Sequence, residues 1–108
     1  MQSRILTFIL FFNCLMTILS AQSGEVIVSG KVIEGQSQMP VGYAMVAISD
    51  PKTDEVLTGI TTTEDGFFEV STKAENFYVE ISFIGFKSRR IDDFDIIDNR
   101  LDLGEIIL

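Results

Sequence analysis

The sequence predicts an all-β protein, a β-sandwich of about seven short strands that follows a cleavable N-terminal signal peptide. From Val26 onward, apolar residues recur at every second position, which is the period of a half-buried strand. Gly, Pro, Asp and Asn interrupt these runs every 8 to 12 residues or so, as turns between strands do. The first 21 residues instead form one apolar run behind a positive charge. We therefore expect a signal peptide at 1–21 and one domain at 22–108.

The N-terminal segment has the organisation of an export signal. Residues 1–4 are mostly polar and include Arg4, and residues 5–19 are mostly apolar. This run is shorter than the ~20 residues that a membrane-spanning helix needs, so a permanent anchor is the weaker interpretation. We expect cleavage after Ala21, a small residue, which places the protein in the periplasm or at the outer membrane.

Composition excludes several classes of site. Cys14 is the single cysteine, and it follows Phe12 and Asn13 rather than the small residues that precede a lipid-modified cysteine. The chain has no histidine, so after cleavage neither a disulfide framework nor the usual zinc or redox ligands remain. We assign no catalytic, cofactor-binding or metal-binding residue. A formal net charge of −8 disfavours nucleic acid as a partner.

The predicted strands, in chain order, cover 26–33, 42–49, 56–63, 67–70, 77–83, 87–91 and 101–108. In the first strand Val26, Val28 and Val32 share a face, and Gly30 between them allows a neighbour to approach closely. The second strand is apolar on both faces, which favours a central position in its sheet. The sixth strand is expected to pair with the fifth.

Two irregular features are expected between and within these strands. Thr63-Glu64-Asp65-Gly66 contains the Asp-Gly signal of a tight hairpin, with Gly66 at positive φ and Phe68 and Val70 pointing inward. In the last strand Leu101 and Leu103 lie out of phase with Ile106 and Leu108 by one residue. A β-bulge at Gly104-Glu105 would restore the register. Seven strands with one buried face each require two packed sheets.

Three groups of polar residues invite functional hypotheses. The run 61–63 offers threonine hydroxyls beside carboxylates, but no base is available to activate them. The aspartates between Asp92 and Asp102 suggest calcium, yet they lack the glycine and the bidentate glutamate of an EF-hand, and a solvated loop explains them better. Lys31 and Asn99 are the residue types of a cross-strand amide bond, although Asn99 falls in a predicted turn.

Exposed side chains offer two further hypotheses. Lys87, Arg89 and Arg90 form a small basic group beside the aspartates, for which we expect local ion pairing. Four aromatic residues are expected to be exposed or half-exposed and could bind a carbohydrate: Tyr43, Phe67, Tyr78 and Phe86. Packing between strands is the commoner use of such residues.

The order of several short motifs resembles one family, the carboxypeptidase regulatory-like domains, which are prealbumin-like seven-stranded β-sandwiches. The motifs are Gly30-Lys31-Val32, Pro40 with the alternating Ala44, Val46 and Ile48, Thr62 to Phe68, Phe83 to Phe86, and Leu103 to Leu108. The resemblance covers essentially all of 22–108. It implies no hydrolase activity, because related transthyretin-like hydrolases depend on histidines and the zinc carboxypeptidases carry catalysis in a separate domain.

The resemblance also implies a cellular context. Such a domain often follows a signal peptide and opens a TonB-dependent receptor of the Gram-negative outer membrane, where it precedes the plug and barrel. The chain is then either a truncated receptor or a free-standing version of its first domain. We expect a non-catalytic periplasmic interaction domain with a protein partner. The alternative is a small secreted module that binds carbohydrate or protein.

Overall fold

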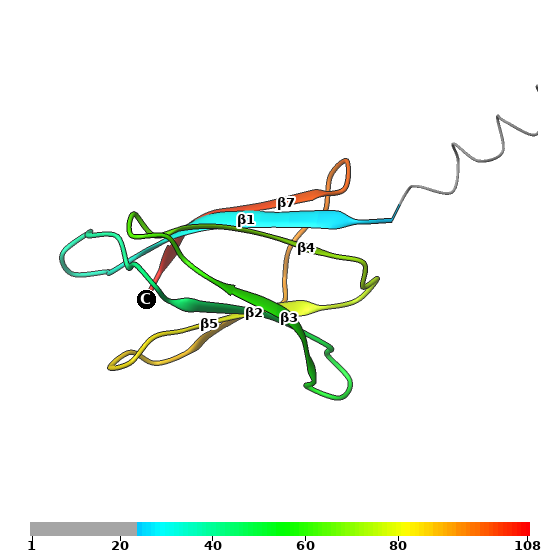
Figure 1. Ribbon diagram of the computed structural model, residues 1–108, viewed down its shortest axis with the longest axis horizontal. Helices are drawn as coiled ribbons and strands as arrows, with labels where there is room; N and C mark the ends of the chain where they lie inside the picture. Colours follow the sequence, from blue (N-terminus) through cyan, green and yellow to red (C-terminus); the bar gives the residue numbers. More distant parts are fainter. Residues whose placement is uncertain (1–23) are drawn as a thin grey trace, which may run out of the picture.

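The computed structural model describes residues 24–108, which fold as a sandwich of two β-sheets (Figure 1). The strands are β1 (Val26–Ile33), β2 (Met45–Ser49), β3 (Val56–Thr61), β4 (Phe67–Thr72), β5 (Tyr78–Ser82), β6 (Arg89–Ile91) and β7 (Arg100–Ile107). One sheet has the order β4-β1-β7 and the other β3-β2-β5-β6. The predicted fold class and strand number are confirmed. The expectations for residues 1–21, including those on Cys14 and cleavage, lie outside the described residues.

Strand β1 is the centre of the three-stranded sheet, antiparallel to β4 and parallel to β7. Val28 and Val32 are completely buried, as their shared face predicts. Gly30 lies between them on the same inward face and opposite Phe68 of β4. A Cβ atom at Gly30 would come within 2.9 Å of two atoms of the Phe68 ring. The expected close approach at Gly30 is therefore confirmed, and its neighbour is an aromatic ring of the core.

The predicted bulge in β7 is present. Ser29 pairs with Asp102 and Lys31 pairs with Glu105, so two residues of β7 oppose Gly30 alone. Gly104 adopts a φ of 64°, which glycine reaches without steric cost. The extra residue returns the strand to register, because Leu101 before it and Ile106 after it are both buried.

Strand β2 is central in the four-stranded sheet, between β3 and β5, as its two apolar faces predict. Val46 and Ile48 of β2 and Val79 and Ile81 of β5 are fully buried against the other sheet. β6 pairs antiparallel with β5, which confirms that prediction too. The regular strand β2 starts later than expected, because Tyr43 has a φ of 63° and interrupts the extended chain.

The hairpin predicted at Asp65-Gly66 is wrong in one respect. The turn exists, with Gly66 at a φ of 82° and its N–H donating to the carbonyl of Thr63 at 2.9 Å. However, β3 and β4 belong to different sheets, so the turn joins the two layers instead of two paired strands. The strand after the turn, β4, pairs with β1 instead, and a hydrogen bond of 2.8 Å from the N–H of Val32 to the carbonyl of Gly66 extends this pairing into the turn.

A two-residue hairpin turn of the favoured type occurs elsewhere, just before β7. Asp98 and Asn99 have φ values of 53° and 60°, and Ile97 and Arg100 on either side exchange two backbone hydrogen bonds of 3.0 Å. Two consecutive residues at positive φ are the signature of a type I′ turn. Asn99 therefore lies in a turn, as expected. Within residues 24–108 no helix is long and apolar enough to cross a membrane.

Candidate functional site

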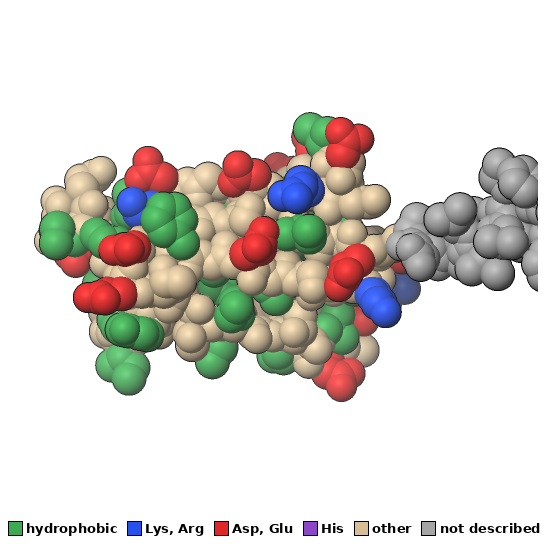
Figure 2. Space-filling model, turned by 45° about the horizontal axis from the view of Figure 1, so that its top comes forward, with side chains coloured by type: hydrophobic (Ala, Val, Ile, Leu, Met, Phe, Trp, Pro, Cys, Tyr) green, Lys and Arg blue, Asp and Glu red, His purple; other side chains and the backbone are tan. Residues whose placement is uncertain are grey.

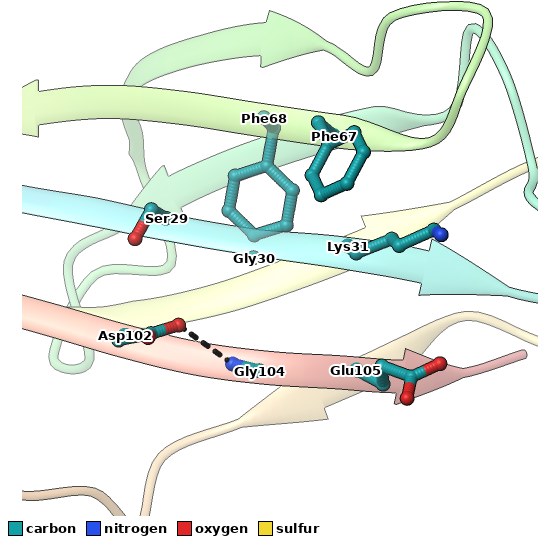
Figure 3. A pocket seen from close by; sticks show the side chains of 8 residues that line it. All are labelled: Ser29, Gly30, Lys31, Phe67, Phe68, Asp102, Gly104 and Glu105. Atoms are coloured by element: carbon teal, nitrogen blue, oxygen red, sulfur yellow. Dashed lines mark hydrogen bonds between the residues drawn. The ribbon is translucent and has the colours of Figure 1, made fainter.

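A shallow pocket lies on the outer face of the three-stranded sheet, at the β7 bulge (Figure 3). Its volume is about 490 Å³. The side chains of Ser29, Lys31, Phe67 and Glu105 face it, and the backbone of Gly30 forms its floor. The pocket lies where the bulge places Gly104, which has no side chain, beside Gly30 of β1.

The polar groups of this pocket mainly stabilise the sheet. The Lys31 ammonium lies 5.0 Å from the centroid of the Phe67 ring, a cation–π distance. Asp102 accepts a hydrogen bond of 3.0 Å from the Gly104 N–H and so holds the bulge (Figure 3). Phe67 is 52% exposed, which confirms the expectation for this aromatic residue. The arrangement offers an exposed aromatic ring with a cation above it. Acidic side chains are spread over the face of the molecule that Figure 2 shows, with few basic ones between them.

A second surface, at one end of the four-stranded sheet, is apolar. We call it the Tyr43 patch; it consists of Tyr43, Met45, Phe83 and Ile84, with Thr61 and Ser82 at its margin. Tyr43 is 67% exposed and Ile84 is 95% exposed. Ile84 occupies the turn after β5, which Gly85 closes at a φ of 90°. Side chains from β2 and from the turn after β5 thus form one contiguous apolar surface in solvent.

The backbone of Tyr43 is strained. A φ of 63° is unusual for an aromatic residue and costs about 1–3 kcal/mol, which the surrounding structure must offset. The Tyr43 N–H donates to the carbonyl of Thr62 at 3.1 Å, and this bond holds the conformation. The strained backbone thus belongs to a residue whose ring is exposed to solvent.

Tyr78, by contrast, is not available as a surface aromatic, and the expectation of its exposure is wrong. Its ring is 4% exposed because the Arg90 guanidinium lies 3.7 Å from the ring centroid. The Tyr78 hydroxyl donates to Asp54 at 3.1 Å. Arg90 also forms ion pairs with Asp54 at 3.7 Å and Asp92 at 3.4 Å. The expected local ion pairing of the basic group is confirmed for Arg90.

This cluster predicts a specific alkaline transition. Burial of the ring, followed by the hydrogen bond to Asp54, raises the pKa of Tyr78 above its usual value of 10.0. Because the neutral phenol is favoured in the folded state, its contribution to stability is complete below pH 10 and is lost as pH rises through the folded pKa. In a Tyr43→Phe variant Tyr78 is the only tyrosine, so absorbance at 295 nm reports it alone. A phenolate midpoint at or below pH 10 would contradict the described cluster.

The aspartates between Asp92 and Asp102 do not converge. Asp92 pairs with Arg90, Asp98 forms the turn before β7, and Asp102 holds the bulge. Among residues 24–108, no group of three or more His, Cys, Asp or Glu side chains is placed to hold a metal ion. Calcium binding therefore finds no geometric support in this part of the chain.

Lys31 and Asn99 lie far apart along the β1–β7 ladder, which Asn99 immediately precedes. Lys31 pairs with Glu105, whereas the Asn99 carbonyl accepts a hydrogen bond from the Ile27 N–H at 3.0 Å. Lys31 is four positions after Ile27 in β1, which is a distance of roughly 13 Å along a strand. The two side chains are not positioned for a cross-strand amide bond.

The sequence reasoning missed the structural role of Thr62. Its side chain is 1% exposed, and its hydroxyl donates to the carbonyl of Val41 at 2.8 Å and accepts from the N–H of Ala44 at 2.9 Å. These two bonds fix the irregular segment that carries Tyr43. A buried hydroxyl at the end of a strand has no distinctive signal in a single sequence.

Comparisons with known proteins agree with this architecture. The sequence model of one protein family, the carboxypeptidase regulatory-like domain, matches residues 27–103. A 9R-lipoxygenase from Cyanothece PCC8801 shares the fold, with a TM-score of 0.57 and 13% sequence identity over 79% of this chain. The match covers 16% of the lipoxygenase, and at this identity it shows the fold alone. No curated protein sequence matches significantly. The family match spans most of the chain, from β1 into β7, and the chain therefore belongs to the carboxypeptidase regulatory-like domain family.

Proposed function

We propose that this chain is a non-catalytic interaction domain that contacts another protein through the Tyr43 patch. The observation that carries the proposal is the exposure of four neighbouring apolar side chains at one end of the sandwich. Burying such side chains against a partner is favourable by roughly 25 cal/mol per Å² of apolar surface. The strained backbone of Tyr43 adds support, because strain of this kind concentrates at functional positions.

We further propose a cellular context, the N-terminal module of a TonB-dependent outer-membrane receptor that takes up nutrients. Support comes from the family of the domain and from the export signal expected at residues 1–21. In this context the domain lies in the periplasm, and its partner is a protein of the periplasm or the outer membrane.

Cell fractionation tests the cellular context. An antibody raised against the sandwich should detect its antigen in the envelope fraction and not in the cytoplasm. In outer membranes, a band far larger than the 12.1 kDa of this chain would support the receptor module. A band confined to the cytoplasm would refute export and the receptor role together.

The role of the patch requires a separate experiment. Replacing Tyr43 and Ile84 with serine should abolish in-cell cross-linking between the domain and an envelope protein, because the apolar contact is lost. Replacing the exposed Lys73 and Glu75 with serine provides a matched control away from the patch, and it should preserve the cross-link. Equal cross-linking in all versions would contradict the proposed contact surface.

Carbohydrate binding remains the second candidate, supported by the exposed ring of Tyr43 but no longer by Tyr78. A glycan array with the domain and its Tyr43→Ser variant separates the two functions. Binding that disappears in the variant would favour the carbohydrate module.

A further inference from the structure

The four edge strands of the sandwich differ in how they are protected. Exposed sheet edges can pair with other chains, and proteins usually block them with charges, bulges or short strands. β7 has a bulge with Asp102 and Glu105, β4 carries the exposed Glu69, and β6 has three residues, two of them arginine. The segment Val56–Thr61, strand β3, contains no charged residue and no proline, and its one irregularity is a register shift at Leu57, near its start. From Thr58 to Thr61, β3 is the least protected edge of the described sandwich.

The backbone of β3 is available for a new strand. The Thr62 N–H donates to the Ala44 carbonyl at 2.9 Å, which marks a hydrogen-bonded position facing β2. Hydrogen-bonded positions alternate along an antiparallel pair, so the backbone N–H and carbonyl of Ile60 also point towards β2. The N–H and carbonyl groups of Gly59 and Thr61 then point away from the sheet. These four groups can bond to one added strand.

The side chains beside this edge suit an apolar or β-branched strand. Val56 is 62% exposed and Leu57 is 44% exposed, at one end of β3. At the other end Thr61 pairs with Met45 of the Tyr43 patch. A Cβ atom at Gly59 would lie 3.2 Å from the Val46 carbonyl oxygen and 3.8 Å from the Met45 sulfur, so this position packs closely against β2 without a side chain of its own. An added strand would cover apolar side chains at both ends of β3.

The charges at the two ends of β3 indicate which kind of strand can pair with this edge. Glu55 precedes the strand, and Glu64 and Asp65 follow it, all three exposed. Every ion pair within residues 24–108 involves Arg90, so these three carboxylates are uncompensated. Two copies paired antiparallel about Gly59 would bring Glu55 of one copy towards Glu64 of the other. This repulsion disfavours a second copy and favours a basic partner strand.

We propose that the β3 edge binds an extended segment of a partner protein that adds a strand to the four-stranded sheet. The segment has an apolar or β-branched centre and basic residues at both ends. Backbone hydrogen bonds to Gly59 and Thr61 provide the docking, and contacts with Glu55 and Glu64 set the charge preference. This inference goes beyond the proposed function, because it does not require the receptor context.

Peptide binding followed by NMR tests the proposal on residues 22–108, which contain all the strands that the structure describes and the core between them. The probe is a nine-residue peptide of alternating valine and threonine with two lysines at each end. We expect shift changes concentrated on β3 and slower amide exchange at Gly59 and Thr61. The same peptide with glutamates at the ends should bind about tenfold more weakly, since each surface pair contributes modestly. A central proline should abolish binding.

A charge reversal in the domain provides the matched control. Glu55→Lys with Glu64→Lys should invert the preference, so that the glutamate-ended peptide binds about tenfold more tightly. Glu69→Lys with Glu105→Lys changes the net charge equally on the other sheet, and it should leave the preference unchanged.

Several outcomes would overturn the inference. The inference is wrong if the domain does not bind the peptide at millimolar concentration, or if the proline peptide binds equally well. It is also wrong if the shift changes lie on β4 or β7, or if sedimentation shows that the domain dimerises through β3. A chain that is found in the cell envelope but gives one of these results refutes the strand addition alone. A chain that binds the peptide but remains in the cytoplasm refutes the proposed function alone.

Discussion

Replacing Gly66 with alanine is expected to lower the free energy of unfolding by about 3 kcal/mol, through two separate causes. Gly66 has a φ of 82°, where an alanine costs roughly 1–2 kcal/mol. Its Cβ atom would also lie 2.5 Å from the carbonyl oxygen of Val32 and 3.2 Å from Pro40. Because the nearest atom is backbone, β1 itself must shift. Urea denaturation measures the loss.

Gly104→Ala isolates the first cause from the second. Gly104 also has a positive φ, of 64°, but no atom lies within 4 Å of where its Cβ would be. We expect a loss of about 1 kcal/mol from the backbone conformation alone. Equal losses in the two variants would contradict the tight contact between the inter-sheet turn and β1.

Replacing Thr62 with valine is expected to cost about 3 kcal/mol, although valine has nearly the same shape. The hydroxyl satisfies both the Val41 carbonyl and the Ala44 N–H. Its removal leaves two buried backbone groups without partners, each costing roughly 1–3 kcal/mol. Thermal and urea unfolding of the variant measure the change.

Thr62→Ser serves as the control, since it keeps the hydroxyl and loses a buried methyl group. Its expected cost is about 1 kcal/mol. If serine destabilised the domain more than valine, the buried methyl group of Thr62 would contribute more to stability than its hydrogen bonds. The described role of Thr62 would then be wrong.

The elements that depend on local pattern could be predicted from the sequence. The seven strands follow the alternation of apolar residues, and the β7 bulge follows from the single-residue phase shift between Leu103 and Ile106. The bulge was predictable because a strand with one buried face has a period of two, and any break in that period must be absorbed in the backbone.

The features that depend on distant contacts could not be predicted. The Asp65-Gly66 turn has the residues of a hairpin, but the strand after it pairs with β1, which is far away in the sequence, and therefore enters the other sheet. Tyr78 alternates like an outward-facing residue, yet Arg90 from β6 covers its ring. Of the Tyr43 patch, the alternation of residues predicts that Tyr43 and Met45 share a face, whereas Phe83 and Ile84 join them only because β5 pairs with β2.

Amide hydrogen exchange across β3 tests most directly the claim that this sandwich presents an open surface for a partner. The alternation of hydrogen bonds predicts that the Ile60 and Thr62 amides exchange at least about a hundredfold more slowly than those of Gly59 and Thr61. The amides of Val46 and Val79 in the buried strands should be the slowest. Equal protection at all four amides would contradict the free β3 edge and the strand addition proposed for it.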